Sequence, residues 1–256
     1  MALILTETDH TFRFAGIARL YGESGLKKLA GSHILIVGLG GVGSWAIEAC
    51  ARSGIGEFTL VDFDDICTSN TNRQLHTTVE TVGQSKVSVM AARIKSINPA
   101  AIVHAIQDVF NESTADGILT SYDFVLDAID SLQYKLLLYY RCEERKLPLL
   151  ITGAAGGKRD PRLIQVQDLG LSYNDNLLFR MRKKLRREDE LKRGQKKFGV
   201  ECIFSTEKAL YPDECQRPAE SSLKLDCDGA VGSAVFLTGA FGFQAAHHIV
   251  EKICQK

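Results

Sequence analysis

Residues 38–43, Gly38-Leu39-Gly40-Gly41-Val42-Gly43, decide the fold of this chain. They follow the short apolar run 33–37, whose β-branched residues predict a buried parallel strand. They precede residues 44–52, which we expect to form a helix that ends at Gly54. Glycines let the backbone approach a phosphate closely, and the free N–H groups of a helix N-terminus favour negative charge. The stretch therefore predicts a strand–turn–helix unit that binds phosphate.

The glycine stretch alone does not separate a triphosphate site from a nicotinamide or flavin site. Residues 58–62 predict the next buried strand, and Asp62 at its end lies where such folds bind a ribose hydroxyl. The polar stretch 62–74 does not suit the flat apolar slot that a nicotinamide needs. Arg73 and Lys86 would instead neutralise a highly charged phosphate chain. We therefore favour a nucleoside triphosphate.

Asp130 is a second acidic residue at the end of an expected strand. Residues 123–129 predict that strand, and Asp130 comes directly after it. Mg2+ prefers carboxylate oxygens and the phosphates of its nucleotide as ligands. Asp130 is therefore a candidate ligand for the Mg2+ ion of a bound nucleotide, with a role as a strand-end cap as the alternative.

Strands and helices alternate along much of the chain, which is typical of a doubly wound parallel sheet. Beyond the glycine unit we expect helices at 85–97 and 131–145, and strands at 102–106 and 149–152. Residues 163–167 alternate apolar and polar side chains, which predicts a more exposed antiparallel strand. We predict an α/β fold, a Rossmann-like doubly wound and mostly parallel sheet with an antiparallel C-terminal extension. Its ligand would bind beyond the carboxyl ends of the strands.

A chain of 256 residues is long enough for one α/β domain with a sizeable core. We expect 1–256 to form a single domain, with a nucleotide-binding half at about 1–158 and a substrate-covering half at about 159–256. Hydrophobic and charged contents of 45% and 24% are typical of soluble globular proteins. No basic segment followed by an apolar run opens the chain, and seven scattered cysteines predict no disulfide framework. The cytoplasm is the expected compartment.

Cysteine spacing argues against a structural zinc site. Tetrahedral thiolate sites use Cys-x-x-Cys pairs, and the chain has none. We therefore predict no zinc site, and a site built from distant cysteines is the open alternative. Cys227 is a candidate acceptor thiol, although its two acidic neighbours disfavour the reactive thiolate form.

Positive charge is concentrated in residues 180–197, where ten Lys or Arg residues accompany three acids. Met181 and Leu185 are followed by no clear apolar stripe, so we expect a mobile or solvent-exposed segment, which we call the basic arm. A polyanion is the natural partner of such a segment, and a solvated helix face is the alternative.

Residues 230–246 form a long apolar stretch rich in Gly and Ala. We expect a buried helix that packs on the sheet, because small side chains permit close helix contacts. The stretch also reaches the lower bound of length for a membrane span, so peripheral or C-terminal membrane association is the alternative.

Taken together, these motifs resemble the adenylation domain that ubiquitin-activating enzymes share with bacterial sulfur-carrier adenylyltransferases. The resemblance is carried by residues 38–43, Asp62, residues 69–74, Lys86 and residues 127–130. Within that superfamily the chain is most similar to the tRNA threonylcarbamoyladenosine dehydratases, over essentially its whole length. The stretches that carry this second resemblance are 13–22, 152–157 and 198–207.

The resemblance implies an enzyme that uses ATP to cyclise threonylcarbamoyladenosine next to the anticodon of tRNA, with loss of water. ATP and Mg2+ are the implied cofactors, and tRNA is the implied partner of the basic arm. The implied catalytic residues are Asn70, Arg73, Lys86 and Asp130. The implied nucleotide-binding residues are Gly38, Gly40, Gly41, Gly43, Asp62, Asp64, Arg73, Gln74 and Lys86.

The resemblance also implies a homodimer, in which an arginine of one subunit reaches the triphosphate of the other. Sulfur-carrier relatives place this arginine two residues after an aromatic residue. Gly16 occupies that position after Phe14 here, so Arg13 or Arg19 is the candidate. A cysteine desulfurase or another sulfur acceptor is a further implied partner.

Three other functions remain open at this point. An adenylyltransferase for a ubiquitin-like sulfur carrier would use the same ATP site on a C-terminal Gly-Gly, but would be expected to have zinc pairs and a clear acceptor cysteine. A nicotinamide oxidoreductase is disfavoured by Arg73 and Lys86. A non-enzymatic tRNA-binding module would not need the phosphate-binding residues.

Overall fold

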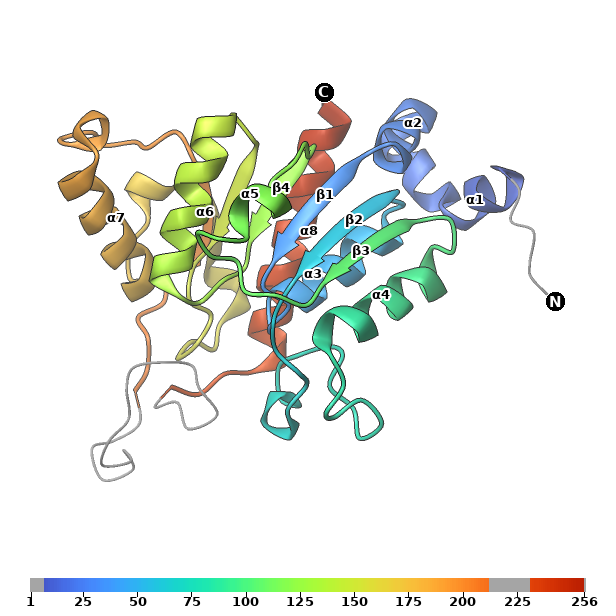
Figure 1. The fold of residues 1–256 in the computed structure, drawn as a ribbon, viewed down its shortest axis with the longest axis horizontal. Helices are drawn as coiled ribbons and strands as arrows, with labels where there is room; N and C mark the ends of the chain where they lie inside the picture. The colour runs from blue at the N-terminus through green and yellow to red at the C-terminus, as the bar shows by residue number, and fades with distance from the viewer. Residues whose placement is uncertain (1–6, 212–230, 256) are drawn as a thin grey trace.

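The described residues, 7–211 and 231–255 of a computed structural model, form an α/β fold around one seven-stranded sheet (Figure 1). In spatial order the strands are β3 (Ile102–Ile106), β2 (Glu57–Val61), β1 (His33–Val37), β4 (Phe124–Asp127), β5 (Leu149–Thr152), β7 (Glu201–Ser205) and β6 (Ile164–Asp168). Neighbouring strands are parallel except for the antiparallel pair β6 and β7. The predicted fold class, including the antiparallel extension, is confirmed.

Helices cover both faces of the sheet (Figure 1). They are α1 (Glu7–Arg13), α2 (Ala15–Ala30), α3 (Gly43–Arg52), α4 (Lys86–Ile97), α5 (Ala115–Ile118), α6 (Leu132–Arg145), α7 (Asn176–Glu188) and α8 (Val235–Gln255). Successive residues of a strand point to opposite faces. Ile34 and Ile36 of β1 therefore join the core under α3 and α8, whereas Leu35 and Val37 join the core under α5 and α6. Burial on both faces explains why β1 is apolar throughout.

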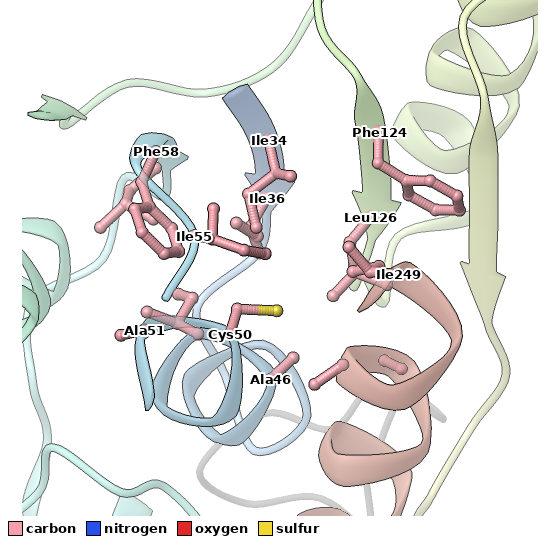
Figure 2. Packing of buried hydrophobic residues seen from close by; sticks show 14 of the residues in the cluster. Ile34, Ile36, Ala46, Cys50, Ala51, Ile55, Phe58, Phe124, Leu126 and Ile249 are labelled. Carbon is pink, nitrogen blue, oxygen red and sulfur yellow. The ribbon is translucent and has the colours of Figure 1, made fainter. Parts of the chain in front are cut away.

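The core on the α3 and α8 side sits directly beneath the strands that lead to the glycine turn. Figure 2 shows Ala46 and Cys50 of α3 near Ile36 of β1, and Ile249 of α8 beside Leu126 of β4. All five side chains are almost completely buried. The helix that begins at the glycine turn is therefore fixed to the sheet by its apolar side chains.

Helix α8 crosses α3 at very short range. A Cβ atom on Gly242 would lie 2.6 Å from the Cβ of Trp45, so only glycine permits this contact. The buried helix predicted within 230–246 is confirmed from Val235 onward, and it continues to Gln255. No helix in 7–211 or 231–255 combines the length and the apolar content that crossing a bilayer requires.

The basic arm differs from its prediction. Residues up to Glu188 belong to α7, which buries Leu178, Met181 and Leu185 against the core shared with α6. This i, i+3, i+7 spacing is an apolar stripe on a helix. Residues 180–188 therefore form a helix with one buried side and an exposed basic face, which was the alternative, rather than a mobile segment. The stripe starts at Leu178, before the run of charges, and a window defined by charge alone does not contain its first residue.

Candidate active site

A cleft of about 640 Å³ opens beyond the carboxyl ends of β1, β2, β4 and β5. The predicted residues that line it are Gly38, Gly40, Gly41, Asp62, Asp64, Asn70, Arg73, Gln74, Lys86 and Asp130. Of the residues implied to be catalytic or nucleotide-binding, all of which the structure describes, only Gly43 lies outside the lining. The stretch 152–156 forms another part of the wall. Segments that are far apart in the sequence thus meet at one edge of the sheet.

The glycines of the turn have two different roles. Gly38 has a φ of 94°, and a Cβ on it would lie 2.6 Å from the carbonyl oxygen of Ala128. A Cβ on Gly43 would lie 1.9 Å from the carbonyl oxygen of Gly38. These two glycines let the turn close, whereas a Cβ on Gly40 would meet no atom closer than 3.9 Å. Gly40 therefore leaves open space in the cleft rather than shaping the turn.

Asp62, at the end of β2, connects the glycine turn to Lys86. Its Oδ2 accepts a hydrogen bond from the backbone N–H of Leu39 at 2.6 Å, and its Oδ1 accepts one from the N–H of Asp64 at 2.9 Å. The Nζ of Lys86 lies 3.9 Å from Asp62 Oδ1 and 2.6 Å from Asp64 Oδ2. Burial raises the pKa of Asp62, and the charge of Lys86 opposes that effect. The lysine side chain is only 5% exposed, and the residue lines the cleft.

Arg73 lines the cleft, and its backbone is held between two helices. Its carbonyl oxygen accepts hydrogen bonds from Trp45 Nε1 of α3 at 3.1 Å and from Thr238 Oγ1 of α8 at 3.2 Å. Its Nη1 donates to the carbonyl oxygen of Ser69 at 2.8 Å and to Asn72 Oδ1 at 3.0 Å. Arg73 makes no ion pair with any acid in the described part of the chain. Its positive charge is therefore available to an anion in the cleft.

Asn70 and Gln74 complete this loop. The Oδ1 of Asn70 accepts a hydrogen bond from the N–H of Cys67 at 3.1 Å, and its carbonyl oxygen accepts one from the N–H of Gln74 at 2.9 Å. Gln74 is buried, and its Oε1 has no hydrogen-bond partner in the described residues. Asn70 therefore shapes the loop, while Gln74 brings an unsatisfied oxygen to the cleft.

Asp130 is an exposed residue in the lining of the cleft. It follows a fully buried ion pair, in which Lys135 Nζ lies 2.8 Å from Asp127 Oδ1. The same Asp127 oxygen accepts a hydrogen bond from the N–H of Ile129 at 3.0 Å, so the ion pair also holds the backbone just before Asp130. Within 7–211 and 231–255, Asp130 has no hydrogen-bond or ion-pair partner. Its free oxygens are of the type that Mg2+ prefers.

His76 is a buried histidine that no motif or spacing in the sequence indicates. Its side chain is 3% exposed, and neither ring nitrogen has a hydrogen-bond partner among the described residues. Burial is the main cause that lowers its pKa to about 4, and the charge of Lys86 lowers it further. The ring is therefore neutral at neutral pH.

Asp175 connects the cleft to α7. Its Oδ2 accepts a hydrogen bond from the N–H of Ala154 at 2.8 Å, in the wall of the cleft. Its Oδ1 caps the helix by accepting from the N–H of Leu178 at 2.9 Å. Lys158 Nζ lies 3.7 Å away, and burial lowers the pKa of this lysine while Asp175 opposes the shift. One buried carboxylate thus holds both the cleft wall and the first turn of the basic helix.

Comparison with known proteins identifies the family. The sequence model of the ThiF family matches residues 14–256. The chain belongs to the ThiF family. This ThiF-family chain is 44% identical over 252 residues to the tRNA threonylcarbamoyladenosine dehydratase of Escherichia coli (strain K12), covering 95% of the chain and 94% of the relative. The dehydratase of Haemophilus influenzae is 40% identical over the same shares of the two chains.

Solved structures agree with the sequence relatives. The E. coli tRNA N6-threonylcarbamoyladenosine dehydratase, solved in complex with ATP and with AMP, matches this ThiF-family chain with a TM-score of 0.86 and 41% identity. The match covers 98% of this chain and 97% of the other. The E. coli molybdopterin-synthase adenylyltransferase is 34% identical, but over only 54% of this chain. The resemblance inferred from the motifs is therefore confirmed.

Some predicted residues of the ThiF-family chain lie away from the cleft. Arg13 and Arg19 are exposed on α1 and α2, and Arg13 Nη1 donates to the carbonyl oxygen of Ile97 at 3.3 Å. Cys227 lies outside the described residues, as does Cys215. The roles of an arginine across a dimer, of an acceptor thiol and of thiolate zinc binding therefore stay predictions.

The cleft also contains residues that sequence reasoning missed. Asp108, Val109 and Phe110 line it, and they follow the end of β3. The rule that ligands bind beyond the carboxyl ends of the strands would have selected this loop once strand 102–106 had been predicted. Tyr134 of α6 and Leu177 of α7 gave no comparable signal, because only the packing of their helices brings them to the cleft.

Proposed function

We propose that this ThiF-family chain is an ATP-dependent enzyme that dehydrates threonylcarbamoyladenosine in tRNA, next to the anticodon. The observation that carries the proposal is the near full-length similarity to the E. coli dehydratase, which was solved with ATP and with AMP. A sulfur-carrier adenylyltransferase is less well supported, because such a relative matches only about half of the chain.

The chemistry follows from the weakness of a carboxylate as an electrophile. The free threonyl carboxylate attacks the α-phosphate of ATP, so that pyrophosphate leaves and an acyl-adenylate forms. The urea-like group of the same modified base then attacks the activated carbonyl, closes a ring and expels AMP. The net change in the nucleoside is the loss of one water. The second step is intramolecular and therefore needs little further activation.

The cleft residues divide this work between them. Arg73 and Lys86 neutralise the charge that develops on the phosphates, because each brings a cation to the lining. Asn70 and Gln74 position the loop beside the phosphates, and the glycine turn with Asp62 and Asp64 seats the nucleotide. Asp130, a carboxylate with free oxygens, would hold the Mg2+ ion that accompanies ATP.

The basic arm, residues 180–197, is the proposed contact for tRNA. Arg180, Lys183 and Arg187 are exposed on α7, and Phe179 beside them is 55% exposed. Exposed cations contact phosphates, and an exposed aromatic ring can stack on an unpaired base. In this proposal residues 1–158 hold the nucleotide, and residues 159–256 cover it and receive the tRNA.

We further propose that the enzyme works in the cytoplasm as a homodimer. Phe12 and Leu20, directly next to the candidate residues Arg13 and Arg19, are 84% and 78% exposed. Burial of these apolar side chains against a second subunit would favour association. The same contact would bring an arginine from α1 or α2 toward the partner's nucleotide. The cysteine desulfurase partner stays a prediction.

The test is mass spectrometry of nucleosides from tRNA that carries threonylcarbamoyladenosine, after incubation with the protein, ATP and Mg2+. We expect one water to be lost from the modified nucleoside, and no loss when ATP is omitted. Arg73→Ala and Asp130→Ala should abolish the product, while Lys95→Ala, an exposed change on α4, should not. An unchanged nucleoside, in tRNA that the E. coli dehydratase does convert, would contradict the proposal. ATP–pyrophosphate exchange that requires a sulfur-carrier protein would support the adenylyltransferase.

A further inference from the structure

Two histidines and a glutamate from three neighbouring strands lie together at the opposite end of the sheet from the cleft. His33 and Glu57 are the first residues of β1 and β2 and are paired in register, and His104 lies in β3. His104 Nε2 is 2.8 Å from Glu57 Oε1, and His33 Nδ1 is 3.6 Å from the same oxygen. The three side chains offer ligand atoms that all lie within 4.8 Å of one another.

Glu57 has an unusual set of partners for a carboxylate. In residues 7–211 and 231–255, its ion pairs are with His33 and His104 and with no lysine or arginine. The carboxylate therefore faces two imidazole rings rather than the fixed positive charge of a lysine or an arginine. Glu57 is 33% exposed, which leaves room for a cation to enter from solvent.

His33 is already oriented as a metal ligand is. Its Nε2 lies 2.9 Å from Thr59 Oγ1, and its ring packs edge-on against Tyr122 with centroids 4.7 Å apart. When Nε2–H donates to the Thr59 hydroxyl, the Nδ1 lone pair faces Glu57. Histidines that bind metals usually donate their second ring N–H to a partner in this way, which fixes the ring and the tautomer.

We propose that His33, Glu57 and His104 form a binding site for a divalent transition metal ion of the Zn2+ type. Two imidazoles and one carboxylate are a common ligand set for such ions, and three protein ligands leave a fourth position for water. Ligand atoms about 2.1 Å from zinc lie roughly 3.4 Å apart in a tetrahedron. His104 is 50% exposed and Glu57 is partly exposed, so small side-chain rotations close the present separations.

The proposed site is distinct from the nucleotide cleft. It lies about 17 Å along β1 from the glycine turn, because five residues separate His33 from Gly38 and each strand residue advances about 3.3 Å. A metal here would connect the edge strand β3 to β2 and β1, and would not touch the phosphates. The lack of Cys-x-x-Cys pairs does not exclude this site, because none of its ligands is a thiolate.

The test is a Zn2+ titration of the full chain, with a chromophoric chelator as competitor. We expect His104→Gln and Glu57→Gln each to weaken Zn2+ binding at least about tenfold. The matched control is His247→Gln, which removes an exposed histidine from α8 and should leave the affinity unchanged. A Co2+ absorption spectrum of the wild-type protein should lack thiolate charge-transfer bands.

Equal Zn2+ affinity in wild type, His104→Gln and Glu57→Gln would overturn the proposal, and so would thiolate bands with Co2+. Because His104 is exposed on the sheet edge, the substituted chain should keep its melting temperature when a chelator removes free metal. His104→Gln should also retain dehydratase activity. A failure of the zinc titration is therefore a separate result from a failure of the tRNA assay.

Discussion

Two lysine–aspartate pairs, one at the end of β4 and one at the end of β2, differ in what surrounds them. Lys135 and Asp127 are both fully buried, and their charged atoms lie 2.8 Å apart. Lys86 lies 3.9 Å from Asp62, shares its charge with the half-exposed Asp64 and lines the cleft. We call Lys135 and Asp127 the sealed pair, because both side chains are closed off from solvent and can only hold the backbone in place. We call Lys86 with Asp62 and Asp64 the open pair, because its lysine lines the cleft, where a phosphate can compete for it.

The largest expected effect is the loss of stability when the lysine of the sealed pair is removed. Lys135→Met should destabilise the protein by about 3–5 kcal/mol, because Asp127 would be left as an unpaired buried charge. Urea denaturation measures the change. The double variant Lys135→Met with Asp127→Leu is the control and should recover much of the lost stability, since it removes both charges. If the unfolding free energy of Lys135→Met were within about 1 kcal/mol of the wild-type value, water would have to reach Asp127.

Removing the lysine of the open pair should act on catalysis instead. Lys86→Met should lower the single-turnover dehydration rate by about 100- to 1000-fold, because one preorganised cation would be missing from the charged transition state. Lys95→Met removes an exposed lysine from the same helix and should leave the rate unchanged. A normal rate in Lys86→Met would remove this lysine from the proposed catalytic residues.

A pH titration tests the surroundings of Lys86. The pKa of His76 falls to about 4 in the folded protein, against about 6.5 when unfolded. Because the unfolded chain binds the proton more readily, His76 contributes stability that is complete above pH 6.5 and is lost as pH falls toward 4. The loss should amount to about 3 kcal/mol. Unfolding free energies measured across this range should be flatter for His76→Gln than for wild type.

The smallest effect is expected at the exposed partner of the open pair. Asp64→Asn should change the unfolding free energy by less than about 1 kcal/mol, because the Asp64 carboxylate is 45% exposed and solvent screens its charge. Lys86 would then be freer to contact phosphate. Calorimetric titration with ATP measures the second effect, and a loss of several kcal/mol on unfolding would contradict the description of this pair as open.

The sequence predicted the open pair better than the sealed one. Lys86 stood out because it follows a polar stretch at a strand end, where ligands of parallel sheets bind. Lys135 lies among the apolar and polar residues of an ordinary helix, and nothing in its neighbours indicates that it points inward toward Asp127. Which charges a helix buries depends on how the helix packs, and a local pattern does not contain that information.

Strand order was also beyond local patterns. The antiparallel strand at 163–167 was predicted, and β6 confirms it. The strand beside it, β7, was not identified, although it lies between β5 and β6 in the sheet. The chain reaches β7 only after passing through α7, so its pairing is set by contacts between distant segments.

The close contact between α3 and α8 has a consequence for how the protein folds during its synthesis. Helix α3 follows the glycine turn near the start of the chain, and its Trp45 packs against Gly242 near the end. A ribosome therefore completes the glycine turn long before it releases the helix that covers α3. Until α8 has been synthesised, the side of α3 that packs against it lacks its cover, so folding around the glycine turn waits for a segment far along the chain.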